Sequence, residues 1–207
     1  YEVIVDEQND SLRSDLKCPH CKAVVPESKW EPVHTTFFDP ILKQTIRQLR
    51  IEPVLINYTV GSTRYEKLPD DQDRQTLNTA ESLLGTRGLP AIALIDGKET
   101  QRNAPIGVTY LHQFFTSREH LFVAALLHQI QKYPDSNLRQ MLLFALTASL
   151  PYTSRMRRFR ADRKGGGPLS GTLYIGSLIT PPHVLKTFQR NAATIADSLT
   201  PPVDPRR

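Results

Sequence analysis

The chain has 207 residues, of which 39% are hydrophobic, and a formal net charge of +5. This length is typical of one medium domain or two small ones, and it is enough to bury a core. Two cysteines are too few for a disulfide-rich secreted scaffold, which favours a reducing compartment, the cytoplasm. No apolar run reaches the roughly 18 residues of a membrane span, and the basic balance favours a polyanionic partner over a membrane.

The first quarter of the chain is predicted to contain short strands and one helix. Residues 1–5 are apolar and β-branched and predict a strand, entered without an initiator Met or a signal peptide, so we expect an internal segment of a longer chain. The turn at residues 18–21 leads into a short strand at residues 23–25. Residues 38–49 predict a short helix, because Asp39 is a favourable N-cap and Pro40 suits the first helical position.

The next part combines a hairpin, a helix and a long connection. Residues 53–58 and 64–67 predict two strands joined by a turn at Gly61-Ser62. An aspartate at position 70, 71 or 73 is expected to cap a helix that runs to about Leu84. Residues 85–109 are rich in Gly and Pro and predict a long connection with one strand at residues 91–95.

The second half predicts three helices. The sequence Thr116-Ser117-Arg118-Glu119 fits a capping box, so a helix begins there and ends before Pro134. Asp135 or Ser136 caps the next helix, which Pro151 is expected to interrupt. A short strand is predicted at residues 172–175, and Pro181-Pro182 opens the last helix. Its inward positions are Val184, Leu185, Phe188, Ala192, Ile195 and Leu199.

These elements predict an α+β fold, with a small zinc-ribbon-like β part at the N-terminus and then a mixed, mainly helical part with short strands. We divide the chain into four regions. They are residues 1–68, a half zinc ribbon and β-hairpin region; residues 69–115, a long connecting region; residues 116–200, a helical region that carries a basic arm at residues 155–167; and residues 201–207, a tail.

The sharpest local motif is Cys18-Pro19-His20-Cys21. Two thiolates at this spacing can hold one edge of a tetrahedral zinc ion, and the tight turn points both sulfur atoms at the metal. A structural zinc site needs four ligands, so Cys18 and Cys21 make half of one. A redox dithiol is the alternative, but a thioredoxin-type CxxC opens a helix, and here a β-branched stretch follows.

A basic run follows the second predicted helix of the second half. It contains six basic residues against the single acid Asp162: Arg155, Arg157, Arg158, Arg160, Arg163 and Lys164. Arg-rich segments neutralise phosphates and release counterions, and Gly165-Gly166-Gly167 would let such an arm order on binding. We predict nucleic-acid contacts from these six residues and from Arg118. The alternative is a solvated basic helix end.

Other candidate sites are weak. His112, His120 and His128 are spaced by eight, which suits no single metal site, so they are expected to be core or surface residues. No Walker loop, HExxH, GxGxxG or Gly-x-Ser-x-Gly motif is present, and no pair of carboxylates stands out for acid–base catalysis.

Seven stretches, taken in order, resemble one family. They are Cys18-Pro-His-Cys21, Pro53-Val-Leu-Ile-Asn-Tyr58, Tyr65-Glu-Lys67, Gly107-Val-Thr-Tyr-Leu-His-Gln-Phe-Phe-Thr-Ser-Arg118, Leu143-Phe-Ala-Leu-Thr147, Ser154-Arg-Met-Arg-Arg-Phe159 and Gly171-Thr-Leu-Tyr174. They are similar to the middle region of bacterial and archaeal DNA methylases that modify an exocyclic amino group of adenine or cytosine. The resemblance runs from about Tyr1 to Leu199.

The resemblance implies a non-catalytic insert that contributes DNA binding and target recognition in a restriction-modification type of enzyme. In that family the flanking parts bind S-adenosylmethionine and hold the target amine through an Asp-Pro-Pro-Phe/Tyr motif, and neither catalytic motif occurs here. The implied partners are double-stranded DNA and the remaining methyltransferase domain of the same parent chain. The implied zinc ribbon has a second cysteine pair upstream.

Two other functions stay open from the residues themselves. The chain could be a zinc-stabilised structural or protein-interaction module whose basic arm contacts an acidic protein. It could also be a free-standing dithiol oxidoreductase that uses Cys18 and Cys21.

Overall fold

A computed structural model describes residues 5–6, 11–12, 15–17, 21–26, 29, 31–160 and 167–199. Within these residues the chain has five α-helices and four antiparallel sheets of two strands each. The expected α+β class is therefore confirmed. In the described part of the chain, no helix combines the length and the apolar character that crossing a membrane requires.

The N-terminal region forms two small hairpins. Their strands are β1 (Val5–Asp6), β2 (Ser11–Leu12), β3 (Asp15–Lys17) and β4 (Val24–Pro26), and the pairs are β1 with β2 and β3 with β4. The predicted strand at residues 23–25 overlaps β4. Most of the predicted strand at residues 1–5 lies outside the described residues.

The predicted helix at residues 38–49 is wrong, because this stretch belongs to a hairpin. Strand β5 (His34–Asp39) pairs with β6 (Gln44–Leu49), and residues 40–43 form the turn. Asp39 does cap backbone N–H groups, although in a turn and not in a helix. Its Oδ1 accepts hydrogen bonds from the N–H groups of Ile41 and Leu42. Lys43 then adopts a positive φ of 54°, which reverses the chain where a helix would have continued it.

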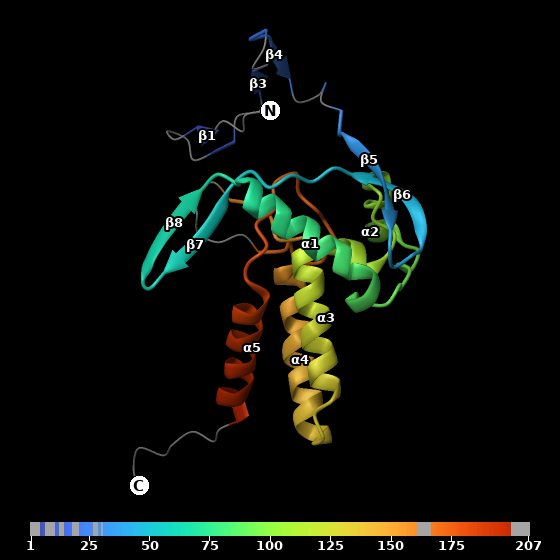
Figure 1. Cartoon of the computed structure of the whole chain (residues 1–207), viewed down its shortest axis with the longest axis vertical. Helices are drawn as coiled ribbons and strands as arrows, with labels where there is room; N and C mark the ends of the chain where they lie inside the picture. Colours follow the sequence, from blue (N-terminus) through green and yellow to red (C-terminus); the bar gives the residue numbers. More distant parts are fainter. Residues whose placement is uncertain are drawn as a thin grey trace.

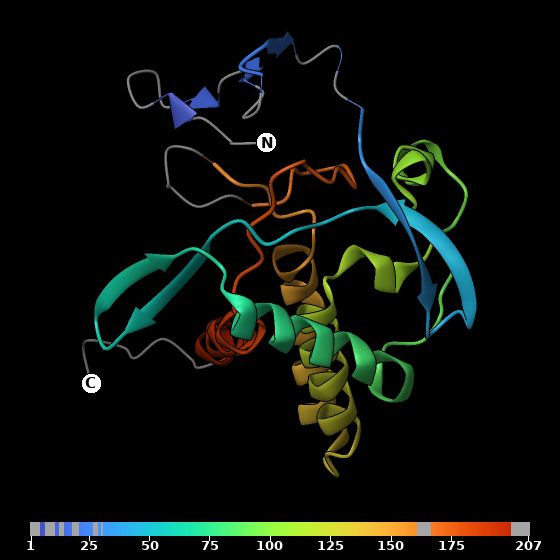
Figure 2. The same ribbon diagram turned by 45° about the horizontal axis from the view of Figure 1, so that its top comes forward.

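The second predicted hairpin is confirmed. Strand β7 (Ile56–Val60) pairs with β8 (Thr63–Lys67), and the turn lies at Gly61 and Ser62, with φ of 59° at Gly61. Figures 1 and 2 show this ribbon projecting on the opposite side of the molecule from the β5–β6 hairpin. The predicted first strand, residues 53–58, began three residues too early.

Helix α1 (Asp71–Arg87) begins where the aspartates predicted it and runs three residues beyond the expected end. Asp70 is the N-cap, and it exchanges side-chain-to-backbone hydrogen bonds with Asp73 in a capping box. The long connection after it holds more structure than predicted: α2 (Lys98–Gln101), η2 (Ala104–Ile106) and η3 (Leu111–Phe114). The strand predicted at residues 91–95 is reduced to one bridge between Ala93 and Tyr110.

Three helices form the lower body of the molecule in Figure 1, and α1 crosses their upper end. They are α3 (Ser117–Gln131), α4 (Ser136–Thr153) and α5 (Val184–Leu199). Asp135 caps α4 as predicted, through a 2.8 Å bond from the N–H of Leu138. Thr116 is the N-cap of α3, but its side chain bonds the carboxylate of Glu119 instead of closing a capping box.

Two further predictions in this half are wrong. Pro151 does not interrupt α4, which continues through it to Thr153, since a proline in the last turn removes only one backbone hydrogen bond. Residues 172–175 form no strand. On α5, Leu185 and Leu199 are exposed, whereas Val184, Phe188, Ala192 and Ile195 face inward as predicted.

The buried apolar core begins at the upper end of the helical body, beside η3 and the start of α5, and extends along α3 as far as Ile130, near its other end. Its members are Leu89, Val108, Phe114, Phe115, Val123, Ala124, Ile130, Leu146 and Val184. The segment that leaves α4 contacts the upper part of this core, since the N–H of Arg155 donates to the carbonyl of Phe114, and this segment carries the predicted basic run.

Candidate nucleic-acid interface

The basic run starts where α4 ends, and its first arginine belongs to the interior. Arg155 is 2% exposed. Its backbone N–H donates to the carbonyl of Phe114 at 2.7 Å, and its Nη1 donates to the carbonyl of Gln113 at 2.9 Å. Burial lowers the pKa of Arg155 to about 10. The structure thus places this predicted site residue as an anchor between α4 and η3.

The following residues are held in an extended conformation by a neighbouring segment of chain. The N–H of Phe159 donates to the carbonyl of Leu178, and the N–H of Thr180 donates to the carbonyl of Arg157. Arg158 and Ile179 form the bridge between the two segments. In Figure 1 these orange stretches meet above the helical body, near the start of α5. This pairing fixes the backbone from which Arg157, Arg158 and Arg160 project.

The first three arginines of this segment have no acidic partner among the described residues. No carboxylate of the described chain lies within ion-pair distance of Arg155, Arg157 or Arg158. The Nε atoms of all three are buried and make no hydrogen bond within this part of the chain. Burial, and secondly the positive charge of Arg190 on α5, lower the pKa of Arg157. Arg190 is a member of this charged group that sequence reasoning missed.

The remaining predicted contact residues differ in their settings. Arg160 is exposed. Arg163 and Lys164 lie outside the described residues. Arg118 is half exposed, and its guanidinium pairs with the buried carboxylate of Glu119, the Nε–Oε1 distance being 2.7 Å. Burial raises the pKa of Glu119, and Arg118 opposes that rise. The charge of Arg118 is therefore already compensated inside the protein, unlike that of Arg157 or Arg158.

An open hollow of about 600 Å³ lies beside the basic segment. Its walls include the side chains of Tyr152, Met156 and Leu169, and Glu99 provides its acidic group. The carboxylate of Glu99 accepts hydrogen bonds from the hydroxyl of Thr172 and the N–H of Leu173, which lower its pKa although burial opposes them. The acid therefore holds the returning chain in place and leaves the hollow mainly apolar.

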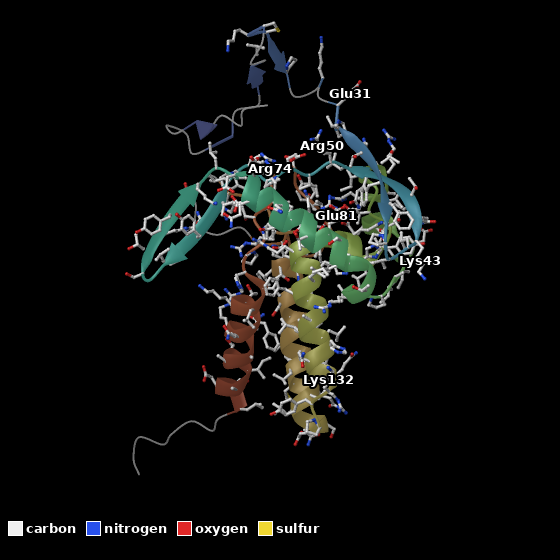
Figure 3. The ribbon with its side chains drawn as sticks, viewed as in Figure 1. Glu31, Lys43, Arg50, Arg74, Glu81 and Lys132 are labelled. Carbon is white, nitrogen blue, oxygen red and sulfur yellow. The ribbon has the colours of Figure 1, made fainter. Side chains whose placement is uncertain are left out.

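The ion pairs of Arg50 and Arg74 are exposed. Figure 3 labels Arg50 and Arg74, and both pair with Glu52, at 2.7 Å and 3.5 Å. The same figure shows Lys132 at the end of α3 that is distant from α1. Pairs of this kind contribute little stability, but each of these arginines has a carboxylate within reach, which Arg157 and Arg158 lack, so the segment after α4 is the stronger candidate for binding an anion.

The described residues do not by themselves supply a zinc site. Cys21 is exposed and is not in a disulfide, whereas Cys18 and His20 lie outside the described residues. Within the described ranges, no group of three or more His, Cys, Asp or Glu side chains is placed to hold a metal ion. Strands β3 and β4 pair with Lys17 opposite Val24, and Cys21 lies three residues before Val24.

The histidines behave as expected for core and surface residues. His112 and His120 are buried, and His128 is exposed. Nε2 of His120 accepts a 2.6 Å hydrogen bond from the N–H of Leu89, so this nitrogen is not available to a ligand. Sequence reasoning missed the pairing of His112 with Asp39, because 73 residues separate them along the chain.

No protein-family model, curated protein or solved structure matches this chain.

Proposed function

We propose that this chain is a non-catalytic internal segment of an S-adenosylmethionine-dependent DNA amino-methyltransferase, and that it contributes DNA binding and target recognition. The observation that carries the proposal is the basic segment after α4. Arg157 and Arg158 project from a backbone that is paired with residues 178–180, and neither forms an ion pair with a carboxylate of the described residues. The ordered resemblance to the middle region of DNA methylases supports the same assignment.

In this proposal the basic segment positions the protein on the DNA and takes no part in methyl transfer. Arginines that contact phosphates fix the register of a protein on a duplex, whereas base contacts specify sequence. A methyltransferase must also extrude its target base from the stack, and the duplex has to be held while this happens. The cofactor and the target amine would be bound by the remaining methyltransferase domain of the same parent chain. The proposed location is the cytoplasm.

The test is the salt dependence of duplex binding. We expect affinity for double-stranded DNA to fall steeply between about 50 mM and 200 mM salt, and Arg157→Gln with Arg158→Gln to reduce the slope by about two. Lys132→Gln with Arg139→Gln, which removes two charges from the far end of the helical body, is the matched control and should leave the slope unchanged. Duplex binding that is absent, or that does not depend on salt, would count against DNA contact.

Zinc enters the proposal only through Cys18 and Cys21. The described residues contain no group of three or more metal ligands, so in this proposal the other two ligands come from the second cysteine pair that the family resemblance implies. Replacing either cysteine by serine should then reduce the zinc content of the parent protein, measured by elemental analysis.

A specific observation also favours the alternative, a structural or protein-interaction module. The β7–β8 ribbon and its flanks expose several large apolar side chains: Val54, Leu55, Tyr58, Val60, Tyr65 and Leu68. Tyr58 and Tyr65 stack on each other with ring centroids 5.5 Å apart. Contiguous exposed apolar groups of this kind are typical of protein contacts. Val60→Lys should abolish capture of a protein partner and leave duplex binding unchanged if this function holds.

A further inference from the structure

The basic segment belongs to a larger part of the chain whose described residues include no acid. Residues 140–160 and 167–196 include no Asp or Glu, while they include Arg155, Arg157, Arg158, Arg160, Lys186 and Arg190. These two stretches contain most of α4, most of α5 and the described residues between the two helices. The nearest acid in the sequence is Asp162, which lies outside the described residues. Among the described residues, Arg157, Arg158 and Arg190 form no ion pair with a carboxylate.

The packing of α5 on α4 brings one more arginine toward this segment. Asn191 of α5 donates a 3.0 Å hydrogen bond from Nδ2 to the hydroxyl of Ser149 on α4. Thr187, one helical turn before Arg190, is buried. Positions three residues apart share a helix face, so Arg190 starts from the edge of the face that packs on α4. Its charge is close enough to Arg157 to lower the pKa of that residue, second to burial.

Placing Arg157 near Arg190 while buried N–H groups lack hydrogen-bond acceptors costs the folded chain free energy. A buried N–H without a partner loses its hydration and gains nothing in return, and a like charge adds repulsion. The Nε atoms of Arg157 and Arg158 are in this position. An oxyanion removes both costs together, because it offers several acceptor atoms and a negative charge in the planar geometry that guanidinium groups match.

We propose that Arg157, Arg158 and Arg190 form a binding site for one phosphate group, and that this group is a phosphodiester of the DNA backbone. The proposal rests on the proposed function for the source of the phosphate, but not for the site itself. The DNA contact is then a defined site and not a diffuse basic surface. The segment after α4 provides Arg157 and Arg158, and α5 provides Arg190. Arg190 is exposed, so the site is accessible from solvent.

The first experiment uses inorganic phosphate as the probe on the whole chain. Nitrogen–proton NMR spectra of the arginine side chains are recorded during titration with phosphate, with chloride at equal ionic strength as the reference. We expect the Nε signals of Arg157 and Arg158 to shift and saturate. Arg190→Gln should weaken phosphate binding by about tenfold or more, as loss of a charge-assisted partner implies.

Lys186→Gln is the matched control, because it removes the same charge from an exposed position one turn earlier on α5. It should change phosphate affinity by less than about twofold. Both substitutions are on exposed side chains, so the fold is retained and can be checked by the helical circular dichroism signal. Equal losses for Arg190→Gln and Lys186→Gln would overturn the site and leave only a diffuse positive field.

The second experiment separates the two sources of phosphate. If the DNA backbone supplies it, Arg190→Gln lowers the salt slope of duplex binding by about one and Lys186→Gln does so less. If Arg190→Gln abolishes phosphate binding and leaves duplex binding unchanged, the phosphodiester assignment is wrong and a free phosphate compound is the ligand. If the wild-type chain binds phosphate but no duplex, the proposed function fails while the anion site stands.

A third variant tests an internal explanation. Asp162→Asn removes the acid that is nearest in sequence. Phosphate binding that occurs only in Asp162→Asn would mean that this carboxylate already neutralises the arginines, which would overturn the proposal. Equal phosphate binding by the wild-type chain and Asp162→Asn supports it.

Discussion

The Nε2 atom of His112 lies 2.9 Å from Oδ2 of Asp39, and both side chains are buried. Asp39 ends strand β5, and His112 belongs to η3, so this contact ties the β5–β6 hairpin to the helical part of the fold. His120 of α3 lies alongside, with its ring centroid 5.8 Å from that of His112. Three titratable side chains therefore share one buried position at the junction of the two parts.

We expect this junction to make the fold sensitive to mild acid. Burial, and secondly the neighbouring His112, lower the pKa of His120 from 6.5 to about 4. Between these values the unfolded chain binds more protons than the folded chain, so the free energy of unfolding decreases as the pH falls through this window. The loss should be on the order of 3 kcal/mol, measured by urea denaturation at several pH values.

His120→Gln is the informative variant, because the glutamine Oε1 can accept the hydrogen bond from Leu89 and does not titrate. Its stability should decline less across the same pH window. His128→Gln replaces an exposed histidine of the same helix and should behave as the wild type. Asp39 contributes at lower pH only: burial raises its pKa, but bonds from His112, Leu42 and Ile41 hold it below 3.8. An unchanged pH profile in His120→Gln would rule out this origin of the acid sensitivity.

Local sequence signals predicted where turns and helix caps occur, but not always which type of element contains them. Asp70 and Asp135 cap helices as expected, because an N-cap is decided by residues within one turn. The same reasoning misassigned Asp39, whose carboxylate caps a four-residue hairpin turn. What decides between the two outcomes is the long-range packing of that hairpin, including the bond to His112, which no local pattern contains.

The sequence predicted most of the arginines of the candidate site, but not how they are arranged in space. The arginine run is visible in the sequence, but the burial of Arg155 depends on carbonyl groups 41 and 42 residues earlier, in η3. Arg190 is separated from Arg157 by 33 positions and carries no motif. The sequence indicates its role only through its position. Arg190 comes three residues after Thr187, beside the inward face of the last predicted helix.

Gly107 should tolerate no side chain. It has φ of 78°, and a Cβ atom there would meet the carbonyl oxygen of Arg47 and lie 2.7 Å from Cα of Gln48. Gly107→Ala should therefore cost more than about 3 kcal/mol, since strand β6 would have to move away. Gly61→Ala is the control: φ is 59° there, but nothing lies within 4 Å, so only backbone strain of about 1 kcal/mol is expected.

Chemical denaturation of the two alanine variants measures this difference. It also tests how β6 docks, because Gln48 donates to the carbonyl of Gly107 at 3.1 Å and His34 lies 3.0 Å from the carbonyl of Pro105. Similar losses in the two variants would mean that the β5–β6 hairpin is not held against this loop.

Arg155 should be important for stability and not for DNA contact. Arg155→Ala removes the anchor to Gln113 and leaves a cavity beside the core, which should cost about 2–4 kcal/mol. Arg155→Met keeps much of the side-chain volume and removes a buried charge, so its loss should be smaller. Duplex affinity of folded Arg155→Met should stay within about twofold of the wild type, whereas Arg158→Gln should reduce the salt slope by about one. A weaker slope in Arg155→Met would instead place its guanidinium at the DNA.

Removal of metal should affect only the neighbourhood of the CxxC. Cys21 lies just before strand β4, in the N-terminal part of the chain, whereas α3, α4 and α5 form the helical body, so we expect zinc to support the former and not the latter. A chelator should therefore change the thermal midpoint of the helical circular dichroism signal by less than about 2 °C. Loss of a metal that supports the helices would lower this midpoint by more. The reactivity of Cys21 toward a thiol reagent should rise if zinc was bound and remain the same otherwise. Cys18→Ser provides the reference for the metal-free state, and a large fall in its thermal midpoint would show that the fold depends on this cysteine after all.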